Sequence, residues 1–173
     1  MKVGVLGAGT MGAGIAQVAA QAGHQVVLVD LNQNVIDKAK SDLEKVLNRL
    51  IEKGKLTSEA SQDIQNRFTY STATADFADC GIIIEAIVEK LTVKHAVFQE
   101  LESIVSEDCI LASNTSSLPI ASIGSVLKNP SRIIGIHFFN PAPLMPLVEI
   151  IPAVQTTTEV VDKAKNLIDS WKK

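Results

Sequence analysis

The chain has 173 residues, of which 46% are hydrophobic and 20% charged, so it is long enough to bury one core and too short for two domains of ordinary size. Its formal net charge of −3 is small, and no dense block of lysine or arginine occurs. This argues against a nucleic-acid-binding or membrane-surface protein, and we expect one domain with a small-molecule ligand.

Short apolar runs rich in β-branched residues alternate with longer segments of helical period, a pattern typical of a parallel sheet covered by helices. The expected strands are residues 3–6, 25–30, 67–71, 81–86, 109–113, 133–137 and 147–151, and the clearest helices are 11–22, 34–53 and 58–66. The sequence thus predicts one α/β domain of Rossmann type, with a doubly wound and mostly parallel sheet.

Residues 159–173 are predicted to form a last helix with an apolar side. Two interpretations stay open. The helix packs back onto the sheet, or its apolar side covers a partner that this chain lacks.

Neither the cysteines nor the N-terminus suggest a secreted or metal-binding protein. Cys80 and Cys109 lie in or beside apolar runs without a CxxC or Cys/His spacing, so we expect buried thiols and no metal site. The first residues lead directly into a strand without the pattern of a signal peptide, and no apolar window is long enough to span a membrane. We therefore expect a cytoplasmic protein.

A glycine-rich loop follows the first predicted strand. Gly7, Gly9 and Gly12, with Met11 between the last two, form a G-x-G-x-x-G pattern between a strand and a helix. There the first glycine permits a tight turn, the second lets the backbone approach a pyrophosphate, and the third lets helix and strand pack closely. Alone the pattern is weak evidence, because glycine-rich turns also serve only to reverse the chain.

Asp30 supplies the context that the loop needs. It ends the second strand about 20 residues after the loop, where a carboxylate accepts hydrogen bonds from an adenosine ribose and repels a 2′-phosphate. Leu31 and Asn32 offer no arginine for such a phosphate. We expect NAD as the cofactor, although a helix N-cap is the competing role for Asp30.

Of three histidines, His137 is the one placed for chemistry. His24 lies in a predicted turn and His95 follows Lys94 on a polar helix face, so both are expected to be solvated. His137 ends a strand, at the edge where an open α/β sheet presents ligand-binding residues. A histidine in an apolar strand is otherwise often a satisfied core residue.

Glu149 is the expected partner of His137. It interrupts the apolar strand 147–151, where a buried carboxylate needs a cationic or hydrogen-bonding group nearby. If that group is His137, the carboxylate orients the imidazole and fixes its tautomer, which leaves the other ring nitrogen to exchange a proton with an alcohol. An unrelated arginine or backbone partner is the alternative.

A polar run, Ser113-Asn114-Thr115-Ser116-Ser117, follows the strand 109–113. It can be a turn in which Ser117 caps a helix. It can also place groups such as the Asn114 amide and the Ser116 hydroxyl at the carboxyl edge of the sheet, within reach of a nicotinamide ribose and a substrate oxygen.

Five motifs in order resemble those of the L-3-hydroxyacyl-CoA dehydrogenases, including the 3-hydroxybutyryl-CoA enzymes, over essentially the whole chain. The motifs are Gly7-x-Gly9-x-x-Gly12-x-Gly14, Glu85-Ala86-Ile87-Val88-Glu89, Ser113 to Ser117, His137-Phe138-Phe139-Asn140-Pro141 and Leu147-Val148-Glu149. The resemblance implies reversible, NAD-dependent oxidation of an (S)-3-hydroxyacyl-CoA to the 3-oxoacyl-CoA.

The resemblance also implies roles for single residues. His137 would be the general base that takes the 3-hydroxyl proton while hydride leaves C3, and Glu149 would be its partner. The remaining implied contacts are Ser116 at the substrate oxygen, Asn140 at substrate and nicotinamide, and Glu89 and Lys94 at the cofactor.

Arg49 and Lys53 are candidates for binding the coenzyme A phosphates. They lie four residues apart on one helical face, with Lys45 one turn earlier, and such like charges destabilise a helix by roughly a few tenths of a kcal/mol unless something offsets them. A phosphate could do so. Glu52 is the competing explanation, and a plain solvated face is equally open.

Family members are expected to continue into a helical C-terminal domain that dimerises, whereas this chain ends before one. We therefore expect residues 1–173 to be the NAD-binding half of an enzyme that is a homodimer at full length. Two other functions stay open. One is a dehydrogenase of the same superfamily for a free hydroxy acid, and the other is a non-catalytic NAD-binding module in which His137 and Glu149 are only structural.

Overall fold

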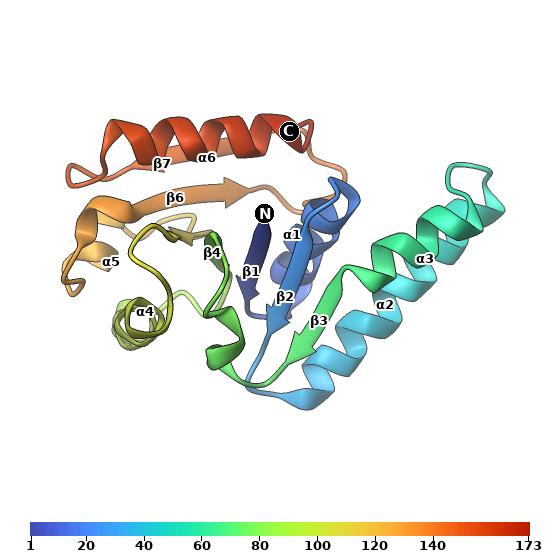
Figure 1. Ribbon diagram of the computed structural model, residues 1–173, viewed down its shortest axis with the longest axis horizontal. Helices are drawn as coiled ribbons and strands as arrows, with labels where there is room; N and C mark the ends of the chain where they lie inside the picture. Colours follow the sequence, from blue (N-terminus) through green and yellow to red (C-terminus); the bar gives the residue numbers. More distant parts are fainter.

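A seven-stranded sheet in the order β3-β2-β1-β4-β5-β6-β7 runs through the molecule (Figure 1), as described for all residues 1–173 by a computed structural model. Its strands are β1 (Lys2–Leu6), β2 (Gln25–Val29), β3 (Phe68–Ser71), β4 (Ile82–Glu85), β5 (Ile110–Ser113), β6 (Ile133–Phe138) and β7 (Val148–Pro152). Neighbouring strands pair in parallel except β7, which pairs antiparallel with β6. The predicted doubly wound, mostly parallel α/β fold is confirmed.

Helices cover both faces of the sheet. They are α1 (Thr10–Gln21), α2 (Gln33–Glu52), α3 (Ser58–Asn66), α4 (Leu91–Ile104), α5 (Ile120–Gly124) and α6 (Thr158–Ser170), with 3-10 turns η1 (Thr74–Phe77) and η2 (Pro130–Arg132). The predicted bounds of α1, α2, α3 and α6 agree with the observed ones to within two residues, except that α6 ends at Ser170 rather than at residue 173. Figure 1 shows α2 and α3 packed side by side as a hairpin that extends beyond the sheet.

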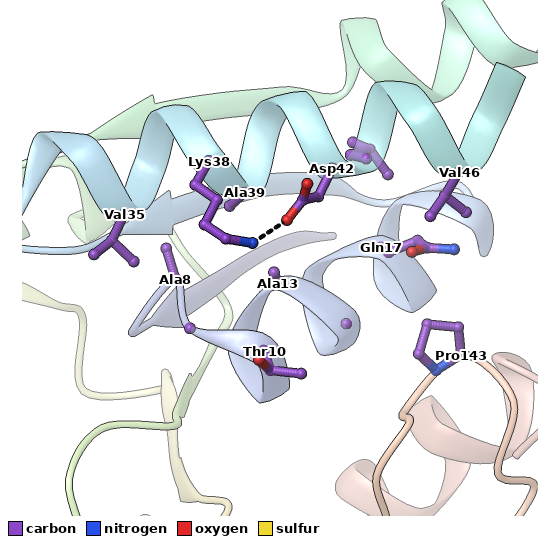
Figure 2. Close-up of a pocket in the computed structure, with 13 residues that line it drawn as sticks. Ala8, Thr10, Ala13, Gln17, Val35, Lys38, Ala39, Asp42, Val46 and Pro143 are labelled. Carbon is purple, nitrogen blue, oxygen red and sulfur yellow. Dashed lines mark hydrogen bonds and ion pairs between the residues drawn. The ribbon is translucent and has the colours of Figure 1, made fainter.

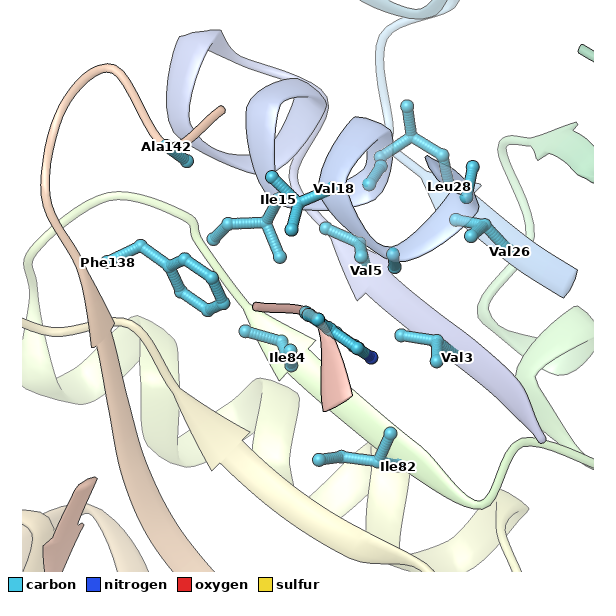
Figure 3. Packing of buried hydrophobic residues seen from close by; sticks show 14 of the residues in the cluster. Val3, Val5, Ile15, Val18, Val26, Leu28, Ile82, Ile84, Phe138 and Ala142 are labelled. Carbon is cyan, nitrogen blue, oxygen red and sulfur yellow. The ribbon is translucent and has the colours of Figure 1, made fainter. Parts of the chain in front are cut away.

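The strands are apolar on both faces because helices bury both faces. On β2, for example, Val26 and Leu28 belong to a cluster of 26 buried residues with α1, α2, α3 and α6, part of which Figure 3 shows. Val27 and Val29 belong to a cluster of 15 with η1, α4 and α5. One sheet therefore separates two cores, which holds its strands in a fixed register.

Helix α6 packs back onto the sheet, which decides between the two interpretations of the last predicted helix. Ala164 and Ile168 are buried, and Trp171, directly after the helix, stacks with Phe138 of β6 at 6.2 Å between ring centroids. Its apolar side thus belongs to the core of this domain. No helix in the structure is both long and apolar enough to span a bilayer.

One residue at the end of α6 adopts a backbone conformation that favours glycine. Lys172 has φ 62°, follows the C-cap Trp171, and donates its backbone N–H to the carbonyl oxygen of Asp169. Glycine is the usual residue at this place because a Cβ atom is unfavourable in the left-handed region. The side chain of Lys172 is exposed and forms no hydrogen bond or ion pair that would offset this cost.

We predict that Lys172→Gly raises the free energy of unfolding by about 1 kcal/mol, since it removes the strain of the left-handed lysine. Lys172→Ala keeps the Cβ atom and should give no such gain. Urea denaturation followed by circular dichroism measures both, and an alanine variant as stable as the glycine variant would contradict the explanation.

Candidate active site

The carboxyl ends of the central strands meet at one edge of the sheet. In the parallel register Leu6 of β1 lies beside Glu85 of β4, Glu85 beside Ser113 of β5, and Ser113 beside Gly135 of β6. The strand order reverses between β1 and β4, and ligands of open α/β sheets bind in the crevice that such a reversal opens. The predicted site residues lie at or near this edge, except Arg49 and Lys53, which lie at the C-terminal end of α2.

The glycine-rich loop brings α1 directly against β1. Gly7 has φ +100°, and a Cβ atom on Gly12 would stand 1.7 Å from the Gly7 carbonyl oxygen, so neither position tolerates a side chain. A Cβ atom on Gly9 would meet no atom within 4 Å. Open space therefore lies in front of the N-terminus of α1, which no side chain caps, and its free N–H groups can bind a phosphate.

Asp30 joins the glycine loop to the end of β2. Its Oδ2 accepts a hydrogen bond from the Ala8 N–H at 2.9 Å, and its Oδ1 accepts one from the Asn32 N–H at 3.0 Å. Asn32, rather than Asp30, is the N-cap of α2. The carboxylate oxygens keep lone pairs for the hydroxyls of a ribose, which fits the predicted role of Asp30.

A buried ion-pair cluster occupies the edge beside β4. The Lys94 Nζ lies 2.6 Å from Glu85 Oε1 and 3.2 Å from Glu89 Oε2, with side-chain exposures of 1% for Lys94 and 0% for Glu85. Partial burial acts to raise the pKa of Glu89, but hydrogen bonds from Thr115 and Lys94 and the Lys94 charge together lower it below its usual value. Glu89 is therefore ionised at neutral pH.

The prediction that Lys94 lies on a polar helix face is wrong. Lys94 lies in the first turn of α4 and turns inward because two carboxylates offset its charge. Glu85 was not singled out as a functional residue at all. The signal was present, since Glu85 is the one carboxylate that ends the otherwise apolar strand β4.

Hydrogen bonds fix the end of β5 and the loop after it to β4 on one side and to β6 on the other. Ser113 Oγ donates to Glu85 Oε2 at 2.7 Å, and Asn114 Oδ1 accepts from the backbone N–H of Phe138 at 2.8 Å. Ser117 does not cap a helix, because α5 begins at Ile120 and its N-cap is Pro119. The turn is instead closed by Thr115 Oγ1, which accepts from the N–H groups of Ser117 and Leu118.

His137 and Glu149 form the predicted pair. They stand opposite each other in the antiparallel ladder of β6 and β7, and His137 Nδ1 lies 2.8 Å from Glu149 Oε2. The expectation that Glu149 is buried was wrong, because β7 is an edge strand and the Glu149 side chain is 51% exposed. The hydrogen bond therefore does not offset a cost of burying Glu149. Nε2, the other ring nitrogen of His137, has no hydrogen-bond partner in the chain.

Seven of the predicted site residues line one cavity of about 330 Å³ at this edge. They are Met11, Glu89, Lys94, Asn114, Ser116, His137 and Asn140. The cavity thus combines a histidine with an unengaged nitrogen, a hydroxyl and amide groups beside the start of α1. A proton-transfer reaction on a ligand held next to the glycine loop is the chemistry that this set of groups can perform.

The other histidines and the cysteines lie outside the cavity. His24 and His95 are partly buried rather than solvated, since His24 packs against Trp171 at 5.7 Å and His95 Nε2 lies 2.8 Å from the Ser122 carbonyl oxygen. Cys80 and Cys109 are free and buried, and burial raises their pKa values to about 12 and about 11. As predicted, both are buried thiols, and such thiols are unreactive.

A groove of about 320 Å³ between α1 and α2 begins at the glycine loop (Figure 2). Gly9 and Thr10 line one end, and Lys38, Asp42 and Val46 of α2 line one wall. Figure 2 shows Lys38 and Asp42 joined as an ion pair across this wall.

Arg49 and Lys53 continue the α2 stripe that lines the groove, because positions 42, 46, 49 and 53 follow the helical spacing of three and four residues. Both are exposed, and neither forms an ion pair, so Glu52 does not engage Arg49. The plain solvated face stays open as the alternative to a phosphate site.

Comparison with known proteins gives relatives along the whole chain. A probable 3-hydroxybutyryl-CoA dehydrogenase of Deinococcus radiodurans is 50% identical over 159 residues, which cover 92% of this chain and 57% of that protein. A 3-hydroxyadipyl-CoA dehydrogenase of Escherichia coli is 42% identical over 171 residues, which cover 99% of this chain and 36% of the relative. The chain thus spans only about a third to a little over half of the lengths of these relatives.

Solved structures agree with the sequence relatives. The crystal structure of a 3-hydroxybutyryl-CoA dehydrogenase from Escherichia coli superposes with a TM-score of 0.98 at 42% identity, covering 100% of this chain and 37% of that one. An (S)-3-hydroxybutyryl-CoA dehydrogenase from Ralstonia eutropha gives 0.96 at 39% identity, covering 99% and 61%. Residues 2–173 match the family model of the 3-hydroxyacyl-CoA dehydrogenase NAD binding domain. The chain belongs to this family, and its cofactor is NAD.

Proposed function

We propose that the chain is the nucleotide-binding and proton-transferring half of an enzyme that reversibly oxidises (S)-3-hydroxyacyl-CoA to 3-oxoacyl-CoA. The observation that carries the proposal is the His137–Glu149 pair, of which His137 lines the same cavity as Ser116, Asn140 and Met11 at the start of α1. A homodimer at full length stays a prediction from the family resemblance.

The residues at the edge of the sheet fit NAD. Gly7, Gly9 and Gly12 leave room for the pyrophosphate at the start of α1, and Asp30 is available to the adenosine ribose. Bound NAD supplies a nicotinamide ring that accepts hydride from C3 of the substrate. Glu89, Lys94, Asn114 and Met11 would hold the nicotinamide end, and one of the three N–H groups of Lys94 is not used by Glu85 or Glu89.

His137 would take the proton of the 3-hydroxyl group. Its Nδ1 faces a carboxylate oxygen of Glu149, which accepts a hydrogen from Nδ1 and leaves the lone pair on Nε2 free. As Nε2 removes the hydroxyl proton, hydride leaves C3 and the C–O bond becomes a carbonyl. Ser116 would donate a hydrogen bond to the substrate oxygen, and Asn140 would orient the substrate and the nicotinamide.

The coenzyme A end of the substrate would lie along the groove between α1 and α2. The groove starts at the glycine loop, and the stripe of α2 that lines it ends in Arg49 and Lys53. Two unpaired cations suit the phosphates of coenzyme A. A free hydroxy acid has no such phosphates, so these contacts would distinguish a thioester substrate from it.

The first test follows the loss of NADH absorbance on addition of acetoacetyl-CoA to the 173-residue chain. We expect NADH consumption with the thioester, and none with acetoacetate or with NADPH. Reduction of acetoacetate at the same rate would instead support a dehydrogenase of free acids. A chain that binds NADH without consuming it would support the non-catalytic NAD-binding module.

We predict that His137→Gln lowers kcat by about a hundredfold or more, because the other ionised acceptor of the cavity, Glu89, is engaged by Lys94 and Thr115. The affinity for NADH and the unfolding midpoint should stay the same, since His137 is at the rim of the sheet. His95→Gln is the matched control and should retain kcat, because His95 hydrogen-bonds to the Ser122 carbonyl and does not line the cavity. Full activity in His137→Gln would support the non-catalytic alternative.

We also predict that Arg49→Ala and Lys53→Ala each raise KM for acetoacetyl-CoA by about two- to fivefold, the usual size of one exposed charge contact. The Kd for NADH should not change. Lys40→Ala is the control on the same helix, because Lys40 lies over the Tyr70 ring instead. An equal rise in KM with an acyl-pantetheine substrate, which lacks the nucleotide phosphates, would count against this placement of coenzyme A.

A further inference from the structure

Glu85 is a fully buried carboxylate to which the proposed reaction assigns no role. It ends β4 at the reversal of the strand order, and its side chain is 0% exposed. Its Oε1 accepts hydrogen bonds from the Ile87 N–H at 2.7 Å and the Lys94 ammonium at 2.6 Å. Its Oε2 accepts one from Ser113 Oγ at 2.7 Å. Such a group would be costly to bury without this set of partners.

The hydrogen bonds fix the charge of Glu85. A backbone N–H and an ammonium can only donate, so Oε1 is an acceptor. Ser113 Oγ itself accepts from the Thr115 N–H at 3.2 Å, which leaves its hydrogen free to point at Oε2. Both oxygens therefore act as acceptors, as in an ionised carboxylate.

The cluster of Glu85, Lys94 and Glu89 consequently carries one positive and two negative charges. Glu85 is enclosed, whereas Lys94 and Glu89 both line the cavity that contains His137. The cluster thus presents a net charge of −1 to that cavity. Without Glu85, one ammonium would face one carboxylate and the cluster would be neutral.

We propose that Glu85 is a positioning residue that makes this cavity favour the oxidised cofactor. It fixes the Lys94 ammonium and supplies the charge that leaves the cluster negative. The nicotinamide ring carries a positive charge when oxidised and none when reduced, so a negative cluster beside it stabilises NAD⁺ relative to NADH. The inference rests on the proposed placement of the nicotinamide ring in the cavity that His137 lines.

The test is the affinity of Glu85→Gln for three ligands, namely NAD⁺, NADH and ADP-ribose, measured by calorimetry on the 173-residue chain. We expect the ratio of Kd for NAD⁺ to Kd for NADH to rise about tenfold over the unsubstituted chain, the order of magnitude for the loss of one nearby charge at an effective dielectric constant of ~20. The Kd for ADP-ribose, which has no nicotinamide, should stay the same.

Two control variants separate charge from structure. Ser113→Ala removes a hydrogen bond to Glu85 without changing any charge, so it should lower stability and leave the ratio unchanged. Glu102→Gln removes a carboxylate from the far end of α4, where it accepts from the N–H groups of Lys128 and Asn129, and should also leave the ratio unchanged.

The possible results separate the role of Glu85 from the placement of the nicotinamide ring. An unchanged ratio in a folded Glu85→Gln chain would overturn the role of Glu85. A chain that binds ADP-ribose, NAD⁺ and NADH with one and the same affinity would instead contradict the placement of the nicotinamide ring. If Glu85→Gln does not fold, Glu89→Gln removes a charge from the same cluster at a half-exposed position and must shift the ratio in the same direction.

Discussion

The close approach of α1 to β1 is the constraint on which the rest of the structure depends. Because Gly12 has no side chain, the helix can lie against the carbonyl of Gly7, where a Cβ atom would stand at 1.7 Å. This contact lets Ile15 and Ala16 reach the buried face of the sheet, and it aims the free N–H groups of the first turn at the crevice between β1 and β4. Core packing and phosphate binding thus follow from one steric condition.

The parallel register then brings together polar residues that are far apart in the sequence. Glu85 and Ser113 end up side by side because each is the last residue of its strand, and Gly135 of β6 lies beside Ser113. The polar groups there hydrogen-bond to one another: Ser113 donates to Glu85, and Asn114 accepts from the backbone of Phe138. A buried polar edge is tolerated because these groups satisfy each other, and the same bonds hold the loops of the cavity in place.

The strands and most of the site could be predicted from the sequence because their signals are local. An apolar run buried on both faces, or a glycine spacing between strand and helix, depends on neighbours in the chain. The burial of Lys94 could not be predicted, because helical periodicity counts lysine as a surface residue and its partner Glu85 belongs to another element. The exposure of Glu149 depends on β7 being the last strand of the sheet, which no local pattern states.

The Glu85–Lys94 and His137–Glu149 pairs differ in how strongly water screens their charges. Glu85 and Lys94 are 0% and 1% exposed, so their attraction and the charge of their cluster act with little screening. Glu149 is 51% exposed, and an ion pair so open to water contributes little energy beyond its geometry. In the free chain the Glu149 carboxylate therefore mainly orients His137. A substrate that lies over this side of β7 would displace water from the pair and strengthen it, so the imidazolium formed by proton transfer would be stabilised most when the reacting alcohol is bound.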